Sequence, residues 1–199
     1  MYPYFQYVNI PNLKIVQEEL WSNYDQVVSH SEQYTSSYKG SHDLNGLKVF
    51  LIDKDLLLSK NPALTQYLTD ITLIDHLKVT AFVEAKHGSP NKVHRDGTFQ
   101  NAMNIPIHNC QDGYTLWFNP VPDEELVGGM VGKTTGSFFV DNPGDPVAKA
   151  RVSNPQWFNT FIPHTSVNES NGTRFSLSLR FGKTWDTSLH ELTEFYEDN

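Results

Sequence analysis

His94 and Asp96 stand two residues apart, so in an extended segment both side chains point to the same face. A neutral imidazole and a carboxylate that point the same way can bind a divalent metal ion, but a third ligand is needed to fix that ion. His164 is the candidate for this ligand, because it lies 70 residues after His94 and at the end of a predicted strand, residues 158–162. Two histidines and one carboxylate on one side of a metal leave three coordination positions open.

A strictly alternating segment, Arg174–Phe181, begins ten residues after His164. Its apolar face consists of Phe175, Leu177, Leu179 and Phe181. Its polar face consists of Arg174, Ser176, Ser178 and Arg180. An ordinary edge strand would show the polar face to water. If that face instead points into a barrel, Arg174 needs an anion, since an unpaired buried charge is costly. A carboxylate bound near the metal would satisfy Arg174 in bidentate fashion, and Ser176 would add a hydrogen bond.

The set formed by His94, Asp96, His164, Arg174 and Ser176 resembles the signature of the Fe(II)- and 2-oxoglutarate-dependent dioxygenases. The resemblance covers residues 78–182. The Phe-Ile-Pro-His run that ends at His164 and the Arg-x-Ser-x-Ser strand are most similar to the aspartyl/asparaginyl and prolyl hydroxylase-like branches. One departure is that many aspartyl/asparaginyl hydroxylases lack the acidic ligand, whereas Asp96 is present here.

The resemblance implies a mainly β fold: a double-stranded β-helix (jelly roll, cupin-like), with helices from the N-terminal third buttressing one sheet. It implies that His94, Asp96 and His164 hold Fe(II), and that Arg174 and Ser176 hold the distal carboxylate of 2-oxoglutarate as co-substrate. The implied activity is hydroxylation of an amino acid, a peptide or a small metabolite.

Two further polar residues are secondary candidates. Asn104 follows the metal-binding turn on a predicted strand and could contact the keto acid or serve only packing. Arg180 could meet an acidic group of the substrate or form an internal ion pair. We expect Arg180 to matter less than Arg174 for keto-acid binding, because along the chain it lies further from His164.

Two other functions remain open at this stage. A cupin-type metalloenzyme could use the same three ligands without a keto acid, but it would have no reason to point an arginine inward near the metal. A non-catalytic jelly-roll binding protein could carry the histidines incidentally, in which case no metal would stabilise it.

The elements that must position these residues fall into two parts. An apolar stripe predicts a helix over residues 13–28, capped by Asn12, and Asn61 followed by Pro62 predicts the start of another. Beyond residue 77 the period changes to two, which predicts short antiparallel strands. The predicted strands are residues 79–84, 102–107, 114–118, 137–140, 158–162 and 174–181.

We therefore expect a single domain over residues 1–199. Residues 1–77 form a mainly helical part, residues 78–182 the jelly-roll core, and residues 183–199 a short helix (189–196) with a tail. Loops at the mouth of such a barrel commonly cover substrate, so residues 120–136 are expected to be among the more mobile. Trp117 and Trp157 could line a pocket, but packing in the core is the expected role.

Composition narrows the function classes. The chain has 199 residues and a net charge of −8, which suits one domain and disfavours a nucleic-acid partner. Cys110 is the only cysteine, which excludes an internal disulfide and a thiolate-rich zinc site. No apolar run approaches the roughly 20 residues of a membrane span, and the first residues do not resemble a secretory signal. We expect a cytoplasmic protein with a small-molecule or peptide substrate; the oligomeric state is not predicted.

Overall fold

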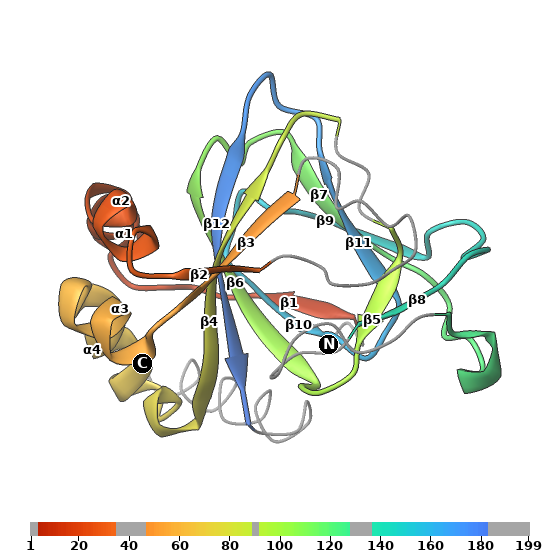
Figure 1. Ribbon diagram of the computed structural model, residues 1–199, viewed down its shortest axis with the longest axis horizontal. Coiled ribbons are helices and arrows are strands. Elements are labelled where there is room, and N and C mark those ends of the chain that lie inside the picture. Colours follow the sequence, from red (N-terminus) through yellow and green to blue (C-terminus); the bar gives the residue numbers. More distant parts are fainter. Residues whose placement is uncertain (1–3, 35–46, 89–91, 128–136, 183–199) are drawn as a thin grey trace.

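The computed structural model describes residues 4–34, 47–88, 92–127 and 137–182 (Figure 1). Two antiparallel sheets face each other as a jelly roll, which confirms the predicted fold. The seven-stranded sheet has the order β1 (Phe5–Tyr7), β10 (Gln156–Asn159), β6 (Asn101–His108), β12 (Arg174–Phe181), β4 (Leu77–Ala85), β3 (Leu47–Ile52) and β2 (Glu32–Tyr34). The five-stranded sheet has the order β8 (Ser137–Phe139), β5 (His94–Asp96), β11 (His164–Asn168), β7 (Gly113–Trp117) and β9 (Ala148–Arg151).

The helices cover the outer face of the seven-stranded sheet, as Figure 1 shows at the left. These helices are α1 (Leu13–Ser22), α2 (Tyr24–Val28), α3 (Lys54–Lys60) and α4 (Pro62–Asp70). There are also two short 3-10 helices, η1 (Ile74–His76) and η2 (Asp123–Glu125), and η2 lies at the right in Figure 1. The main hydrophobic core lies between these helices and the sheet, and it includes Leu20, Leu64, Phe82, Trp157 and Leu179. No helix in the described ranges is long and apolar enough to cross a membrane.

The strand β12 holds the centre of the seven-stranded sheet, between β6 and β4. Its apolar face packs toward the helices: Leu177, Leu179 and Phe181 are completely buried in the main core. Its polar face points into the barrel, where Arg174 and Arg180 reach side chains of the five-stranded sheet. The alternation in the sequence therefore predicts both faces of this strand.

The N-terminal third differs in detail from the prediction. The helical stripe is divided at Asn23, whose side-chain amide donates to the carbonyls of Glu19 and Lys60. Asn12 is left-handed (φ 56°), and its carbonyl, not its side chain, meets the first helical amide groups. This part also contributes three strands and α3, which the sequence analysis did not predict.

Pro62 is the first residue of α4, as predicted. The side chain of Asn61, however, donates to the carbonyl of Leu57 and does not cap that helix.

The strand predicted over residues 158–162 is shifted, and this shift changes the place of a candidate ligand. The observed strand β10 ends at Asn159, and His164 is the first residue of β11. His164 thus belongs to the five-stranded sheet and does not extend β10, which lies in the other sheet. The predicted helix over residues 189–196 and part of the expected lid, residues 128–136, lie outside the described residues.

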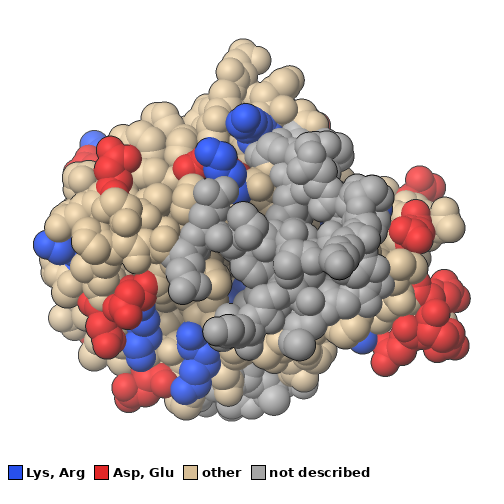
Figure 2. Space-filling model, in the orientation of Figure 1, with Lys and Arg blue, Asp and Glu red and all other residues tan. Residues whose placement is uncertain are grey.

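Acidic side chains gather at one edge of the visible surface in Figure 2, over the turn that contains η2. Elsewhere on this face, acidic and basic side chains are interspersed (Figure 2).

Candidate metal centre and polar cavity

Neighbouring strands of the five-stranded sheet bring the three predicted metal ligands together. His94 and Asp96 lie on β5, and His164 on β11 stands directly opposite His94 in the antiparallel register. One potential ligand atom from each residue lies within 4.8 Å of the others. The backbone N–H of Asp96 donates to the carbonyl of Thr160 at 2.8 Å, which fixes the end of this short strand.

Both histidines are oriented in the same way by the backbone. His94 Nδ1 lies 3.0 Å from the carbonyl of Lys92, and His164 Nδ1 lies 2.9 Å from the carbonyl of Ile162. Because a carbonyl only accepts hydrogen bonds, both Nδ1 atoms must carry the proton. In the neutral form of each ring, Nε2 then carries the lone pair, which is the arrangement that metal-binding histidines need.

The environment of His164 keeps its ring neutral. The side chain is buried, with 5% of the residue exposed. Burial, reinforced by the neighbouring His94, lowers the pKa of His164 to about 3. Its Nε2 lone pair is consequently available at physiological pH.

Arg180 forms an ion pair with the candidate carboxylate ligand. Its Nη1 lies 2.8 Å from Asp96 Oδ2, while Asp96 Oδ1 lies 3.9 Å from His94 Nε2. Of the two roles considered for Arg180, the internal ion pair is the one observed. Distance along the chain from His164 was the wrong guide to the position of Arg180. The strand β12 runs back along the barrel and brings this arginine to the triad.

Arg174 is a buried cation without a carboxylate partner among the described residues. Only 3% of it is exposed, and burial lowers the pKa of its guanidinium. Its Nη2 donates to Ser166 Oγ at 2.6 Å, whereas its Nε has no hydrogen-bond partner in the described part of the chain. A buried guanidinium held only by neutral groups is suited to receive an anion.

Gly113 makes room for that guanidinium. A Cβ atom at this position would lie 3.0 Å from Arg174 Nη1 and 2.5 Å from Val152 Cγ2. Any larger residue would therefore push against the arginine or its neighbour. The close approach of Arg174 on β12 to Gly113 is not visible in the local sequence.

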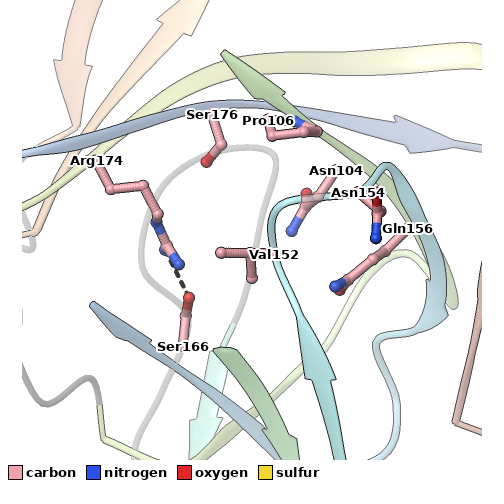
Figure 3. A pocket seen from close by; sticks show the side chains of 8 residues that line it. All are labelled: Asn104, Pro106, Val152, Asn154, Gln156, Ser166, Arg174 and Ser176. Atoms are coloured by element: carbon pink, nitrogen blue, oxygen red, sulfur yellow. Dashed lines mark hydrogen bonds between the residues drawn. The ribbon is translucent and has the colours of Figure 1, made fainter. Parts of the chain in front are cut away.

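A polar cavity lies beside Arg174 (Figure 3). It is lined by Asn104, Pro106, Val152, Asn154, Gln156, Ser166, Arg174 and Ser176. Figure 3 shows Arg174, Ser166 and Ser176 on one side and the three amide side chains on the other. The predicted residues Arg174, Ser176 and Asn104 thus meet in one cavity, whereas Ser166, Asn154 and Gln156 were not predicted.

Unpartnered polar atoms occur along the same inner face. Asn104 Oδ1 and Ser178 Oγ are buried and have no hydrogen-bond partner among the described residues. Asn104 on β6 stands directly opposite Ser178 on β12. Such atoms are costly unless a ligand or water satisfies them.

The strand β11 connects the cavity to the triad. His164 and Ser166 are two residues apart on one face of this strand, so their Cα atoms are about 6.6 Å apart. Arg174, which binds Ser166, is therefore tied to β11 two residues along the strand from His164.

Two tryptophans pack in the protein interior, as predicted. Trp157 lies in the main core, and Trp117 lies in a smaller cluster inside the barrel, where it stacks on Phe5. Phe158 belongs to that smaller cluster and meets the ring of His164 edge-on, with centroids 5.4 Å apart. The triad is thus supported from one side by packed aromatic rings.

Comparisons with known proteins show the fold. No protein-family model and no curated protein matches the sequence. Among solved structures, a non-heme alpha ketoglutarate dependent epimerase, SnoN from nogalamycin biosynthesis, is 11% identical with a TM-score of 0.52, over 88% of this chain and 74% of that one. Oxalate decarboxylase from Bacillus subtilis is 12% identical with a TM-score of 0.40, over 77% of this chain and 28% of that one. At these identities the likeness extends to the jelly-roll, cupin-like fold and no further.

Proposed function

We propose that this protein is a non-haem oxygenase that depends on Fe(II) and 2-oxoglutarate and hydroxylates an amino acid, a peptide or a small metabolite. The observation that carries the proposal is a buried cation, Arg174, that has no carboxylate partner in the described residues. It binds Ser166, which lies two residues along β11 from His164 of the convergent His-His-Asp set. The alpha ketoglutarate dependence in the name of the structurally similar SnoN supports the same co-substrate.

The residues fit the two groups in different ways. His94 Nε2, His164 Nε2 and one oxygen of Asp96 would hold the metal from one side. Arg174 and Ser176 would bind the distal carboxylate of 2-oxoglutarate, with Gly113 giving the guanidinium its space. Asn104 and Ser178, whose polar atoms lack partners among the described residues, would line the path between these two ends.

Bound Fe(II) with 2-oxoglutarate and O₂ supplies hydroxylation, in which one oxygen atom enters the substrate and the other enters succinate as CO₂ is released. The protein contributes position and exclusion of water. His164 is held neutral by burial, the Asp96 carboxylate is held by Arg180, and the rings of Phe158 and Trp117 close the barrel beneath the triad.

A thermal-shift matrix without oxygen tests the proposal. The full chain is heated with Mn(II) or Fe(II), with 2-oxoglutarate, and with both. A ligand at 100 times its dissociation constant stabilises by about 2.7 kcal/mol, which corresponds to roughly 5–10 °C for a domain of this size. We expect metal to raise Tm and 2-oxoglutarate to raise it further only when metal is present.

His94→Ala is the informative variant, and His30→Ala is its control because His30 is exposed in the turn that follows α2. His94→Ala should lose the metal shift and the 2-oxoglutarate shift together, and His30→Ala should keep both. A metal shift without any 2-oxoglutarate shift would favour a cupin enzyme without a keto acid. The absence of a metal shift in the unmodified protein would favour a non-catalytic jelly roll.

A further inference from the structure

We propose that an apolar surface inside the barrel binds an alkyl or aryl part of the substrate. This apolar wall consists of alternate residues of two adjacent strands, β3 and β4: Leu47, Val49, Leu51, Val79, Ala81, Val83 and Ala85. The inference rests on the proposed function, since it places the substrate relative to the metal. Within the proposed class of amino acids, peptides and small metabolites, an apolar wall favours substrates that carry an alkyl or aryl group.

Strand register shows that the wall faces the barrel interior. Val49 stands opposite Val83, and Leu51 stands opposite Ala81. Val83 and Ala81 in turn stand opposite Ser176 and Ser178 on β12. Directly opposite residues share one face of an antiparallel sheet. The wall therefore continues the polar inner face of β12 onto β4 and β3.

The described hydrophobic clusters do not use this wall. The residues between its members, such as Phe50 and Phe82, pack with the helices in the main core. The wall residues themselves belong to none of the three hydrophobic clusters found in the described ranges. Ala81 and Ala85 are buried, and the five larger side chains remain partly exposed. An apolar surface of this kind beside a polar cavity offers a place for apolar groups of a ligand.

The wall begins beside the triad. Val79 stands directly opposite Arg180, whose guanidinium pairs with Asp96. Because adjacent strands are about 4.8 Å apart, β4 lies one strand spacing from β12 and β3 lies two, about 10 Å. A group that covers the wall would therefore have carbon atoms near the Arg180–Asp96 pair, beside the residues that would hold the metal.

The inner face of the seven-stranded sheet thus has a polar part on β6 and β12 and an apolar part on β4 and β3. Its polar half, with Asn104, Ser176 and Arg174, accounts for a keto acid. The wall residues on β3 and β4 carry no charge, Arg180 at their boundary is already paired, and Glu32 stands opposite Leu51 on the edge strand β2. An acidic or basic substrate group would find no partner on the wall, so burial of apolar surface is the interaction that it offers.

Proton NMR relaxation with Mn(II) tests the proposal. The full chain is loaded with Mn(II) and 2-oxoglutarate without oxygen, and 1-hexanol is added as the probe, with 1,2,6-hexanetriol as a polar control. Zn(II) in place of Mn(II) gives the diamagnetic reference. We expect Mn(II) in the protein to accelerate relaxation of the methyl and methylene protons of 1-hexanol much more than those of the triol.

Variants locate the probe on the wall. The double variant Val49→Thr/Val83→Thr keeps side-chain shape but introduces two hydroxyl groups, and should weaken 1-hexanol binding about tenfold. Lys48→Thr is the matched control, because Lys48 lies between two wall residues and points to the opposite face of β3. It should leave the relaxation unchanged.

The outcomes separate this inference from the proposed function. Failure of Mn(II) to bind would overturn both. Normal binding of Mn(II) and 2-oxoglutarate without acceleration of 1-hexanol relaxation would overturn only the apolar wall, as would equal relaxation of the triol. Equal losses in the double variant and in Lys48→Thr would also overturn it.

Discussion

The two faces of the seven-stranded sheet are built on different principles although they share the same strands. On the outer face, large apolar side chains such as Leu177, Leu179 and Phe181 are completely buried against the helices. On the inner face, neighbours of these residues leave polar atoms without partners in the described chain, among them Arg174 Nε and Ser178 Oγ. The first face accounts for stability, and the second leaves interactions available for ligands.

This contrast teaches that adjacent residues of β12 should have separable effects. An outer-face substitution removes packing that exists in the folded chain. An inner-face substitution at Arg174 or Ser178 removes a polar group with an atom that has no partner in the described chain, so its effect should appear mainly in binding. The following substitutions test this separation.

The largest effect is expected on the outer face. Leu179→Ala removes a completely buried side chain from the main core, and should lower the free energy of unfolding by about 2–5 kcal/mol. Urea denaturation measures this loss. Ser178→Ala, one residue away on the inner face, should change stability by much less. If both variants were destabilised equally, the two faces would not differ as we argue.

Arg174→Ala should give the next largest effect, and it should appear in binding. A charge-assisted, bidentate contact contributes on the order of 1.5–3 kcal/mol, so affinity for 2-oxoglutarate should fall roughly 10–150-fold. Mn(II) affinity should stay nearly intact. Calorimetric titration of the metal-free protein with Mn(II) measures the Mn(II) affinity, and titration of the Mn(II)-loaded protein with 2-oxoglutarate measures the 2-oxoglutarate affinity.

Arg151→Ala is a suitable control for Arg174→Ala, since Arg151 is exposed on β9. It should leave 2-oxoglutarate binding unchanged. An Arg174→Ala protein that binds 2-oxoglutarate as well as the unmodified chain would favour a cupin enzyme that uses no keto acid.

The sequence predicts the parts of the site that lie within one strand. Alternation over Arg174–Phe181 is strong enough to identify both faces of β12, and spacing alone pairs His94 with Asp96. Both features are local, because side chains two residues apart in an extended chain share a face whatever the rest of the fold does.

Features that depend on which strands pair could not be predicted in this way. Gly113 is needed because Arg174 approaches from another strand, and Ser166 is important because the same guanidinium reaches it. The strand β5 has three residues, too few for a periodic signal. The assignment to an aspartyl/asparaginyl or prolyl hydroxylase-like branch stays a prediction, as does the domain division.

Arg180 is the clearest case of a role fixed by pairing. Along the chain it lies further from His164 than Arg174 does, yet in the fold it holds Asp96 Oδ2 at 2.8 Å. We expect it to act as a positioning residue, which presents the other oxygen of Asp96 toward the histidines. Groups that hold metal ligands typically contribute 10–100-fold to metal affinity, so Arg180→Gln should weaken Mn(II) binding by about that factor.

Electron paramagnetic resonance of free and bound Mn(II) measures this affinity, and Arg95→Gln is the matched control. Arg95 stands between the two ligands of β5 but points away and pairs with Asp123, which is exposed. Since such a surface pair contributes little, Arg95→Gln should leave Mn(II) affinity within about twofold. Arg180→Lys should restore part of the loss, because it keeps the charge. At saturating Mn(II), Arg180→Gln should weaken 2-oxoglutarate binding less than Arg174→Ala does. Equal effects of the two arginines on 2-oxoglutarate affinity would contradict their assignment to opposite ends of the co-substrate path.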